Sequence, residues 1–141
     1  VGPEEKILKG MASINNIDAK FEGYIDNLSM PEFYSRCDVV VLPSKGDGLI
    51  IEKFGRVLIE AAGCGCAVVG SDVGGIPLAV GERGLVFPDG SAVGLASILE
   101  SMLDPETLNK EKRRSHKYAI ENFSMEVVAA KFYNSVVREL R

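Results

Sequence analysis

The chain is short of the residues that build metal centres and disulfide frameworks. Its 141 residues include no Trp, a single His and three Cys. An odd number of cysteines in a chain of this size indicates reduced thiols. Cys64 and Cys66 form a Cys-x-Cys pair, but His116 lies some fifty positions away, so Cys and His together do not supply four zinc ligands. We therefore expect no metal site, and we expect small buried thiols packed beside Gly63 and Gly65.

The sequence also lacks an apolar run of the roughly 20 residues that a membrane helix needs, and no signal peptide opens it. A formal net charge of −4 and a pI near 5.1 argue against nucleic acid or an anionic membrane as a direct partner. We expect a cytoplasmic protein. The chain opens at Val1-Gly2-Pro3 with no Met, which suggests a piece of a longer protein.

The composition, 46% hydrophobic and 26% charged, is typical of one globular domain over residues 1–141. The runs 38–42 and 67–70 are apolar throughout, which is typical of strands buried on both faces. Further strands are expected at 20–25 and 85–87, with helices at 4–14, 29–36, 52–63, 76–80, 91–103, 105–122 and 124–140. This alternation predicts an α/β fold: a Rossmann-like, doubly wound parallel sheet with helices on both faces, incomplete at its N-terminus and closed by C-terminal helices over about 105–141.

Two glutamates eight positions apart, Glu52 and Glu60, lie in the apolar helical pattern that follows the loop at 44–51. Loops that follow parallel strands meet at one sheet edge, where ligands bind. The helix N-terminus offers backbone N–H groups to an anion, and Gly55 has no Cβ to block a phosphate. In one continuous helix the two acids would stand ~12 Å apart along the axis and ~80° around it. This layout suits a ligand with an anionic centre between hydroxyl-bearing groups.

A structural role for both acids stays open at this point. Arg56 and Glu60 are four positions apart and suit a helical ion pair. Glu52 suits the positive end of the helix dipole. The spacing of the two glutamates does not by itself decide between these pairs and a ligand site.

A set of motifs in a fixed order extends over nearly the whole chain. The motifs are Phe21-Glu-Gly-Tyr24, the stretch from Phe33 to Ser44, Glu52-x-Phe-Gly with Glu60-Ala61, the stretch from Asp72 to Pro77, and Gly84-Leu-Val-Phe87. Together they resemble the C-terminal, donor-binding domain of retaining glycosyltransferases with the GT-B fold, the large glycogen-synthase and mannosyltransferase-like family.

The resemblance assigns roles residue by residue. It implies that Glu60 binds the ribose hydroxyls of a nucleotide-sugar, and that Glu52, the expected catalytic residue, binds a hydroxyl of the transferred sugar. Phe54 and Gly55 would present backbone N–H groups to the sugar and diphosphate. Tyr24 and Ile25 match the stretch whose backbone flanks the base.

The resemblance also implies a function for the longer protein. It would transfer a hexose from a UDP- or GDP-sugar with retention, without metal or cofactor, to an acceptor held by an N-terminal domain. That domain would also make any membrane contact, and this chain alone would have little or no activity. Lys53 departs from a common Gly, and the family's diphosphate-binding Arg and Lys would lie upstream of Val1. A nucleotide-sugar 2-epimerase of the same architecture and a non-catalytic binding or scaffold subunit remain as alternatives.

Overall fold

The computed structural model describes residues 2–46, 51–82 and 84–139. The chain divides into two compact units, Val1–Met30 and Pro31–Arg141. The first unit holds α1 (Glu5–Ile14) and a following segment without regular secondary structure, and α2 (Met30–Ser35) begins at its last residue. The expected strand at 20–25 is therefore wrong. Gly23 has φ +68°, a left-handed conformation that interrupts an extended strand.

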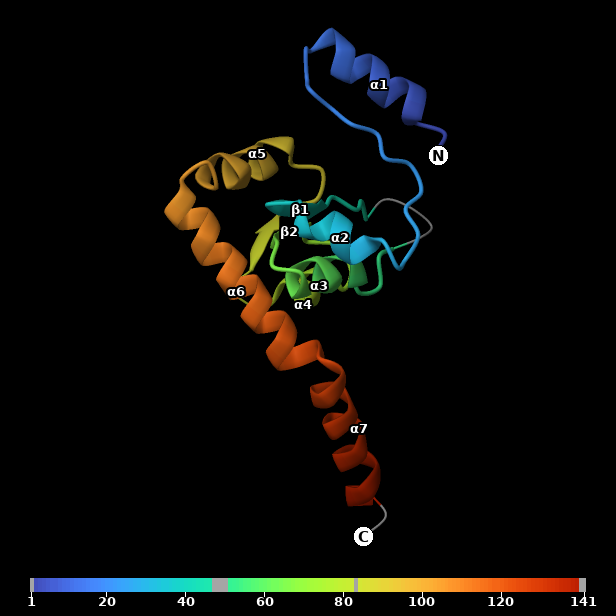
Figure 1. Ribbon diagram of the computed structural model, residues 1–141, viewed down its shortest axis with the longest axis vertical. Helices are drawn as coiled ribbons and strands as arrows, with labels where there is room; N and C mark the ends of the chain where they lie inside the picture. The colour runs from blue at the N-terminus through green and yellow to red at the C-terminus, as the bar shows by residue number, and fades with distance from the viewer. Residues whose placement is uncertain (1, 47–50, 83, 140–141) are drawn as a thin grey trace. The chain divides into compact units, whose positions relative to one another are not determined.

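In the second unit, the described residues form a sheet of three parallel strands in the order β1 (Val39–Leu42), β2 (Ala67–Ser71) and β3 (Leu85–Phe87). The crossover from β1 to β2 contains α3 (Arg56–Gly63), and that from β2 to β3 contains α4 (Ile76–Val80) (Figure 1). This arrangement confirms the parallel α/β architecture.

Helices cover both faces of the central strand β2, all of whose residues are buried. On one face, Ala67 and Val69 join a core cluster with Phe87 and Met102. Side chains of α5 (Ala92–Ser101) and α6 (Pro105–Phe123) pack against that cluster.

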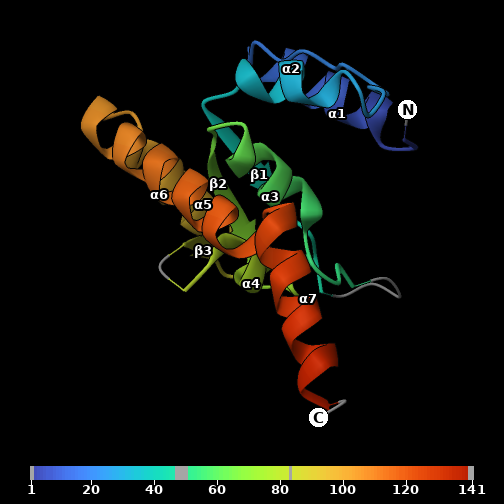
Figure 2. The ribbon, with the colours of Figure 1, turned by 60° about the horizontal axis from the view of Figure 1, so that its bottom comes forward.

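The other face of β2 packs against α3 and α4. A Cβ added at Gly70 would lie 2.1 Å from Ile76 Cγ2 and 3.3 Å from Leu58 Cδ1, so both helices press on the strand there. Figure 1 shows α3 and α5 on different sides of the sheet, and Figure 2 shows α3 beside β1 and β2. The expected doubly wound arrangement is thus confirmed.

The C-terminal part of the second unit is helical, as expected. Helix α6 starts at the Asp104 cap, whose carboxylate accepts the Thr107 N–H at 2.8 Å, and α7 (Met125–Glu139) follows it. Figure 1 shows α7 leading away from the sheet. None of the described helices combines the length and apolar character that crossing a membrane requires.

The two cysteines that flank Gly65 differ in their surroundings. Cys66 has 0% of its surface exposed, and its Sγ–H donates to the carbonyl of Tyr34 at 3.1 Å. Burial raises the pKa of the Cys66 thiol to about 11. Cys64 is exposed, so the prediction of a buried thiol is right for Cys66 and wrong for Cys64. The reason is position: Cys64 caps the C-terminus of α3, while Cys66 enters β2.

Candidate functional site

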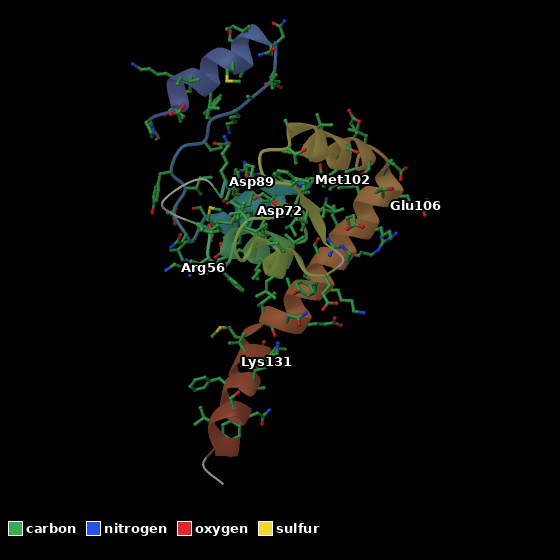
Figure 3. The ribbon with its side chains drawn as sticks, turned by 180° about the vertical axis from the view of Figure 1, so that it is seen from behind. Arg56, Asp72, Asp89, Met102, Glu106 and Lys131 are labelled. Carbon is green, nitrogen blue, oxygen red and sulfur yellow. The ribbon has the colours of Figure 1, made fainter. Side chains whose placement is uncertain are left out.

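The loops that follow the three strands are tied together at the carboxyl edge of the sheet. Ser71 Oγ donates to the carbonyl of Ser44 at 2.7 Å, which joins the ends of β1 and β2. The Asp89 N–H donates to Asp72 Oδ1 at 2.7 Å, and Asp89 Oδ2 accepts the Gly46 N–H at 2.9 Å. Figure 3 shows Asp72 and Asp89 close together. The edge is therefore a connected rim and not three separate loops.

The Gly74-Gly75 pair seats the segment that carries Glu52. The Gly75 N–H donates to the Glu52 carbonyl at 3.1 Å. A Cβ at Gly74 would lie 2.0 Å from the Glu52 carbonyl oxygen, and one at Gly75 would lie 2.0 Å from that of Lys53. Backbone cannot yield easily at such distances, so this contact needs residues without side chains. The two glycines thus allow the backbone of residues 52–53 to pack directly against the turn that follows β2.

The Glu52 side chain caps the turn into α3. Its Oε1 accepts the N–H of Gly55 at 3.0 Å and that of Phe54 at 3.2 Å. These two backbone donors, Gly55 first, hold the pKa of the Glu52 carboxyl below its usual value. Gly55 adopts φ +81° and ψ 44°, and a Cβ there would also meet Leu42 Cδ2 at 3.3 Å. Glycine therefore suits this position on both counts.

This turn corrects the expected helix geometry. Helix α3 begins at Arg56 and not at Glu52, because the left-handed Gly55 cannot continue a helix toward its N-terminus. Glu52 and Glu60 are consequently not two positions on one helix. The separation derived from a continuous helix does not apply.

A cavity of about 540 Å³ opens beside Glu52 at this edge. It is lined by Ser44, Lys45, Ile51, Glu52 and Lys53. Two ammonium groups and one carboxylate therefore belong to residues around one hollow, in an arrangement that suits a ligand with both hydroxyl and anionic groups.

Glu60 lies on the exposed side of α3 and lines a second hollow of about 240 Å³. Phe54, Arg56, Ile59, Phe123 and Val128 complete its lining. Among the ion pairs between described residues, none includes Glu52 or Glu60. The alternative in which Arg56 neutralises Glu60 through an ion pair is therefore not what the structure contains.

A buried tyrosine lies near Glu60. Tyr34 of α2 is 3% exposed, and its hydroxyl has no hydrogen-bond partner among the described residues. Burial, followed by the charge of Glu60 and a hydrogen-bonding contribution from it, raises the pKa of Tyr34 to about 12. The two groups are thus close enough to interact, although the contact falls short of a completed hydrogen bond.

The predicted site residues fall into two groups. Glu52, Phe54 and Gly55 form the turn that leads into α3, and Glu60, within α3, lines the second hollow together with Phe54. Tyr24 and Ile25 belong to the first unit, so their prediction as base-flanking residues stays a prediction. Loop residues 47–50, part of the predicted polar loop, lie outside the described residues. In the part of the chain that the structure describes, no three His, Cys, Asp or Glu side chains gather in a way that could hold a metal ion.

Sequence reasoning did not find the neighbours that organise these residues. The effect of Glu60 on the pKa of Tyr34 carries no spacing signal, because α2 and α3 are separated by a strand and a loop. The role of Gly75 under Lys53 was also missed, although a Gly-Gly pair after a buried strand is a signal of close backbone approach.

Fold and site together define a class: a parallel α/β domain with a cavity at the carboxyl edge of the sheet, where domains of this architecture bind ligands. Residues 1–105 match the family model described as "Glycosyl transferases group 1", and the chain belongs to this family.

Three proteins illustrate the similarity. The glycogen synthase of Mycobacterium tuberculosis (strain CDC 1551 / Oshkosh) is 32% identical over 113 residues, which cover 78% of this chain and 26% of that protein. The sucrose-phosphate synthase of Thermosynechococcus elongatus has a structure that matches 99% of this chain and 35% of its own, with a TM-score of 0.79 and 30% identity. A structure of Anabaena HepE in complex with UDP matches 98% of this chain and 38% of its own, with a TM-score of 0.81. HepE is 23% identical and supports the fold alone. The chain thus spans between a quarter and two fifths of the length of these relatives.

Proposed function

We propose that this chain is the donor-binding part of a retaining, metal-independent hexosyltransferase that acts in the cytoplasm. It would hold a nucleotide-sugar for transfer to an acceptor bound by another domain. The observation that carries the proposal is the position of Glu52: an ionised carboxylate fixed by two backbone donors, outside any ion pair, beside a cavity of about 540 Å³. Family membership supports the reaction type.

The hydrogen bonds at Glu52 select what binds there. Because Oε1 already accepts the N–H groups of Phe54 and Gly55, a second anion at those donors would meet a negative charge. A neutral hydroxyl is not repelled by the carboxylate, since it can donate a hydrogen bond to the carboxylate and accept one from an amide at the same time. We therefore place a sugar hydroxyl, and not a phosphate oxygen, at the Glu52 turn.

The diphosphate would lie toward the cationic residues of the same cavity. Lys45 and Lys53 line it together with Glu52. The leaving nucleoside diphosphate gains negative charge in the transition state, and fixed positive groups stabilise it there. In this proposal Glu52 holds and orients the transferred sugar, while Glu60 accepts hydrogen bonds from the ribose hydroxyls.

Calorimetry tests the donor-binding role directly. HepE was solved with UDP, so UDP is the first ligand to titrate into this chain, followed by GDP and ADP. We expect saturable binding of one of them. In Glu60→Gln the affinity for that nucleotide should fall at least roughly tenfold, because the variant lacks the charged carboxylate that accepts hydrogen bonds from the ribose hydroxyls.

Glu106→Gln is the matched control, because Glu106 is exposed in the first turn of α6 and lies well away from Arg56 in Figure 3. It should bind like the parent chain. If none of the three nucleotides binds the parent chain, the donor-binding proposal is wrong and a scaffold role is favoured.

A further inference from the structure

The hydroxyl of Tyr34 is the buried polar group that the proposed site leaves unexplained. Tyr34 is 3% exposed, and its hydroxyl has no hydrogen-bond partner among the described residues. An unpaired buried hydroxyl destabilises a fold, because it has given up its hydrogen bonds to water without replacing them. A phenylalanine would fill the same space without this cost, so the hydroxyl calls for a partner.

The backbone of Tyr34 is held firmly in place. Its carbonyl accepts both the Cys37 N–H at 2.9 Å and the Cys66 Sγ–H at 3.1 Å. Cys66 is fully buried at the entry to β2, so this contact anchors α2 to the sheet. The aromatic ring therefore leaves its backbone from a fixed point.

Glu60 of α3 is the acceptor that we consider for this hydroxyl. Residues Ala61 and Ala62 are buried and small, and they follow Glu60 directly. Burial, the charge of Glu60 and a hydrogen-bonding contribution from Glu60 raise the pKa of Tyr34 to about 12, which agrees with a carboxylate within reach of the buried hydroxyl. Glu60 itself is exposed, so its side chain can rotate to complete the hydrogen bond.

We propose that Tyr34 is a positioning residue for Glu60: its buried hydroxyl donates to one carboxylate oxygen and holds the group in the orientation that accepts the two ribose hydroxyls of the donor. A carboxylate has about four acceptor positions on two oxygens, so one bond from Tyr34 leaves room for both ribose hydroxyls. An exposed glutamate without this bond loses side-chain freedom on binding, which weakens the complex. The inference rests on the proposed donor-binding role of Glu60.

The first test separates positioning from packing by comparing UDP with 2′-deoxy-UDP, and GDP with 2′-deoxy-GDP, in calorimetry on the chain. In Tyr34→Phe we expect the ribonucleotide to bind roughly 3- to 10-fold more weakly, and the deoxynucleotide to change much less. The preference for ribose should therefore fall at least about threefold. A purely structural tyrosine would weaken both nucleotides equally, and that outcome overturns the proposal.

Tyr118→Phe is the matched control. It removes a phenolic hydroxyl that donates to the carbonyl of Leu78 at 2.9 Å, and Tyr118 is not among the residues that line either hollow. The preference for ribose should stay at its parent value in this variant.

A second test does not need a nucleotide. Urea unfolding of the parent chain, Tyr34→Phe, Glu60→Ala and the double variant forms a double-mutant cycle. We expect Tyr34→Phe to lower the urea midpoint when Glu60 is present and to raise it in the Glu60→Ala background, where the buried hydroxyl has lost its proposed partner. Equal effects in both backgrounds show that the hydroxyl does not pair with Glu60, which overturns the proposal.

The two tests also keep this inference apart from the proposed function. If the parent chain binds neither ribonucleotide, the donor-binding role fails and the positioning of ribose fails with it, whatever the unfolding cycle shows. If the parent binds one but the ribose preference survives in Tyr34→Phe, the positioning role alone is wrong.

Discussion

The Glu52 side chain has two roles, one in the turn before α3 and one in the wall of the cavity. Its Oε1 satisfies the N–H groups of Phe54 and Gly55, and its side chain forms part of the cavity wall. The first task orients the carboxylate before any ligand arrives, so a sugar hydroxyl would meet a group that is already ordered. A change at Glu52 should therefore affect both stability and binding.

Glu52→Gln is predicted to alter the acid end of the stability profile. Backbone donors lower the pKa of the Glu52 carboxyl in the folded chain, so its contribution to stability is complete above the ordinary carboxyl pKa of about 4.5. That contribution is lost as the pH falls through the lowered folded value. Urea midpoints measured from pH 6 to pH 3 should fall less steeply in Glu52→Gln than in the parent.

The control for this profile is Glu126→Gln, which removes one negative charge from the start of α7 and so accounts for the change in net charge. Parallel profiles for Glu52→Gln and the parent chain would show that the Glu52 cap does not form in solution.

Cys66 gives a second prediction at the scale of single residues. Its thiol is buried and hydrogen-bonded to the Tyr34 carbonyl, and its pKa is raised to about 11, while Cys64 is exposed. Because the thiolate is the reactive form, a maleimide at pH 7.5 should label Cys64 well before Cys66. In urea above the unfolding transition the two should react at similar rates. Mass spectrometry of the labelled peptides reads both rates, and equal labelling in the native chain would contradict the burial of Cys66.

At the scale of elements, the Gly74-Gly75 turn before α4 is predicted to determine the position of the segment that carries Glu52. In Gly75→Ala the new Cβ would fall 2.0 Å from the Lys53 carbonyl oxygen and 2.8 Å from Phe54 Cα, so the segment that carries Glu52 must lift. We expect a loss of about 1–3 kcal/mol in the free energy of unfolding, the usual cost of overpacking, and weaker nucleotide binding. Urea unfolding and calorimetry measure the two effects.

Gly63→Ala is the control for this turn. Gly63 is the last residue of α3, and a Cβ there meets nothing within 4 Å. This variant should be as stable as the parent chain or more so, since alanine favours a helix over glycine. A Gly75→Ala chain as stable as Gly63→Ala would mean that the 52–55 segment is not seated on the glycine pair.

The sequence pattern was sufficient for elements whose cause is local. The short helix at 76–80 and the strand at 85–87 lie where the pattern predicted them, and the all-apolar runs became β1 and β2. The pattern failed where the backbone conformation of one glycine decided the outcome. Because of Gly55, α3 begins only at Arg56, and Gly23 interrupts the expected strand at 20–25. Glycine adopts positive and negative φ about equally well, so the sequence alone does not tell which glycine has a left-handed conformation.

The site shows the same division. The glutamate pair and the Phe54-Gly55 step lie between positions 52 and 60 of the sequence, so their motif was visible. Their orientation was not, because it depends on residues that are distant in sequence: Gly75, which packs on the backbone of Lys53, and, in our proposal, Tyr34. In particular, the N–H groups of Phe54 and Gly55 were predicted to donate to the ligand, but they donate to the Glu52 carboxylate. This follows from the conformation of the turn and not from the motif.

For the whole molecule, binding and transfer are predicted to separate. The chain contains the proposed donor site within its second unit, yet it spans about a quarter of the length of the M. tuberculosis glycogen synthase that it resembles. Transfer also needs a binding site for the acceptor, since holding the two reactants in alignment accounts for a large part of the rate enhancement of an enzyme. We therefore expect this chain to bind a donor without turning it over.

Two measurements on one sample check this separation. A nucleotide at about 100 times its Kd stabilises the folded state by about 2.7 kcal/mol, which should raise the Tm of a chain of this size by roughly 5–15 °C. Incubated with UDP-glucose and GDP-mannose, the same sample should release UDP or GDP no faster than buffer does. Release at many turnovers per chain would show that the acceptor half is not required. A rise in Tm without release is expected, because the proposed site, with Glu52 and Glu60, would bind a donor, while a donor alone offers no second reactant.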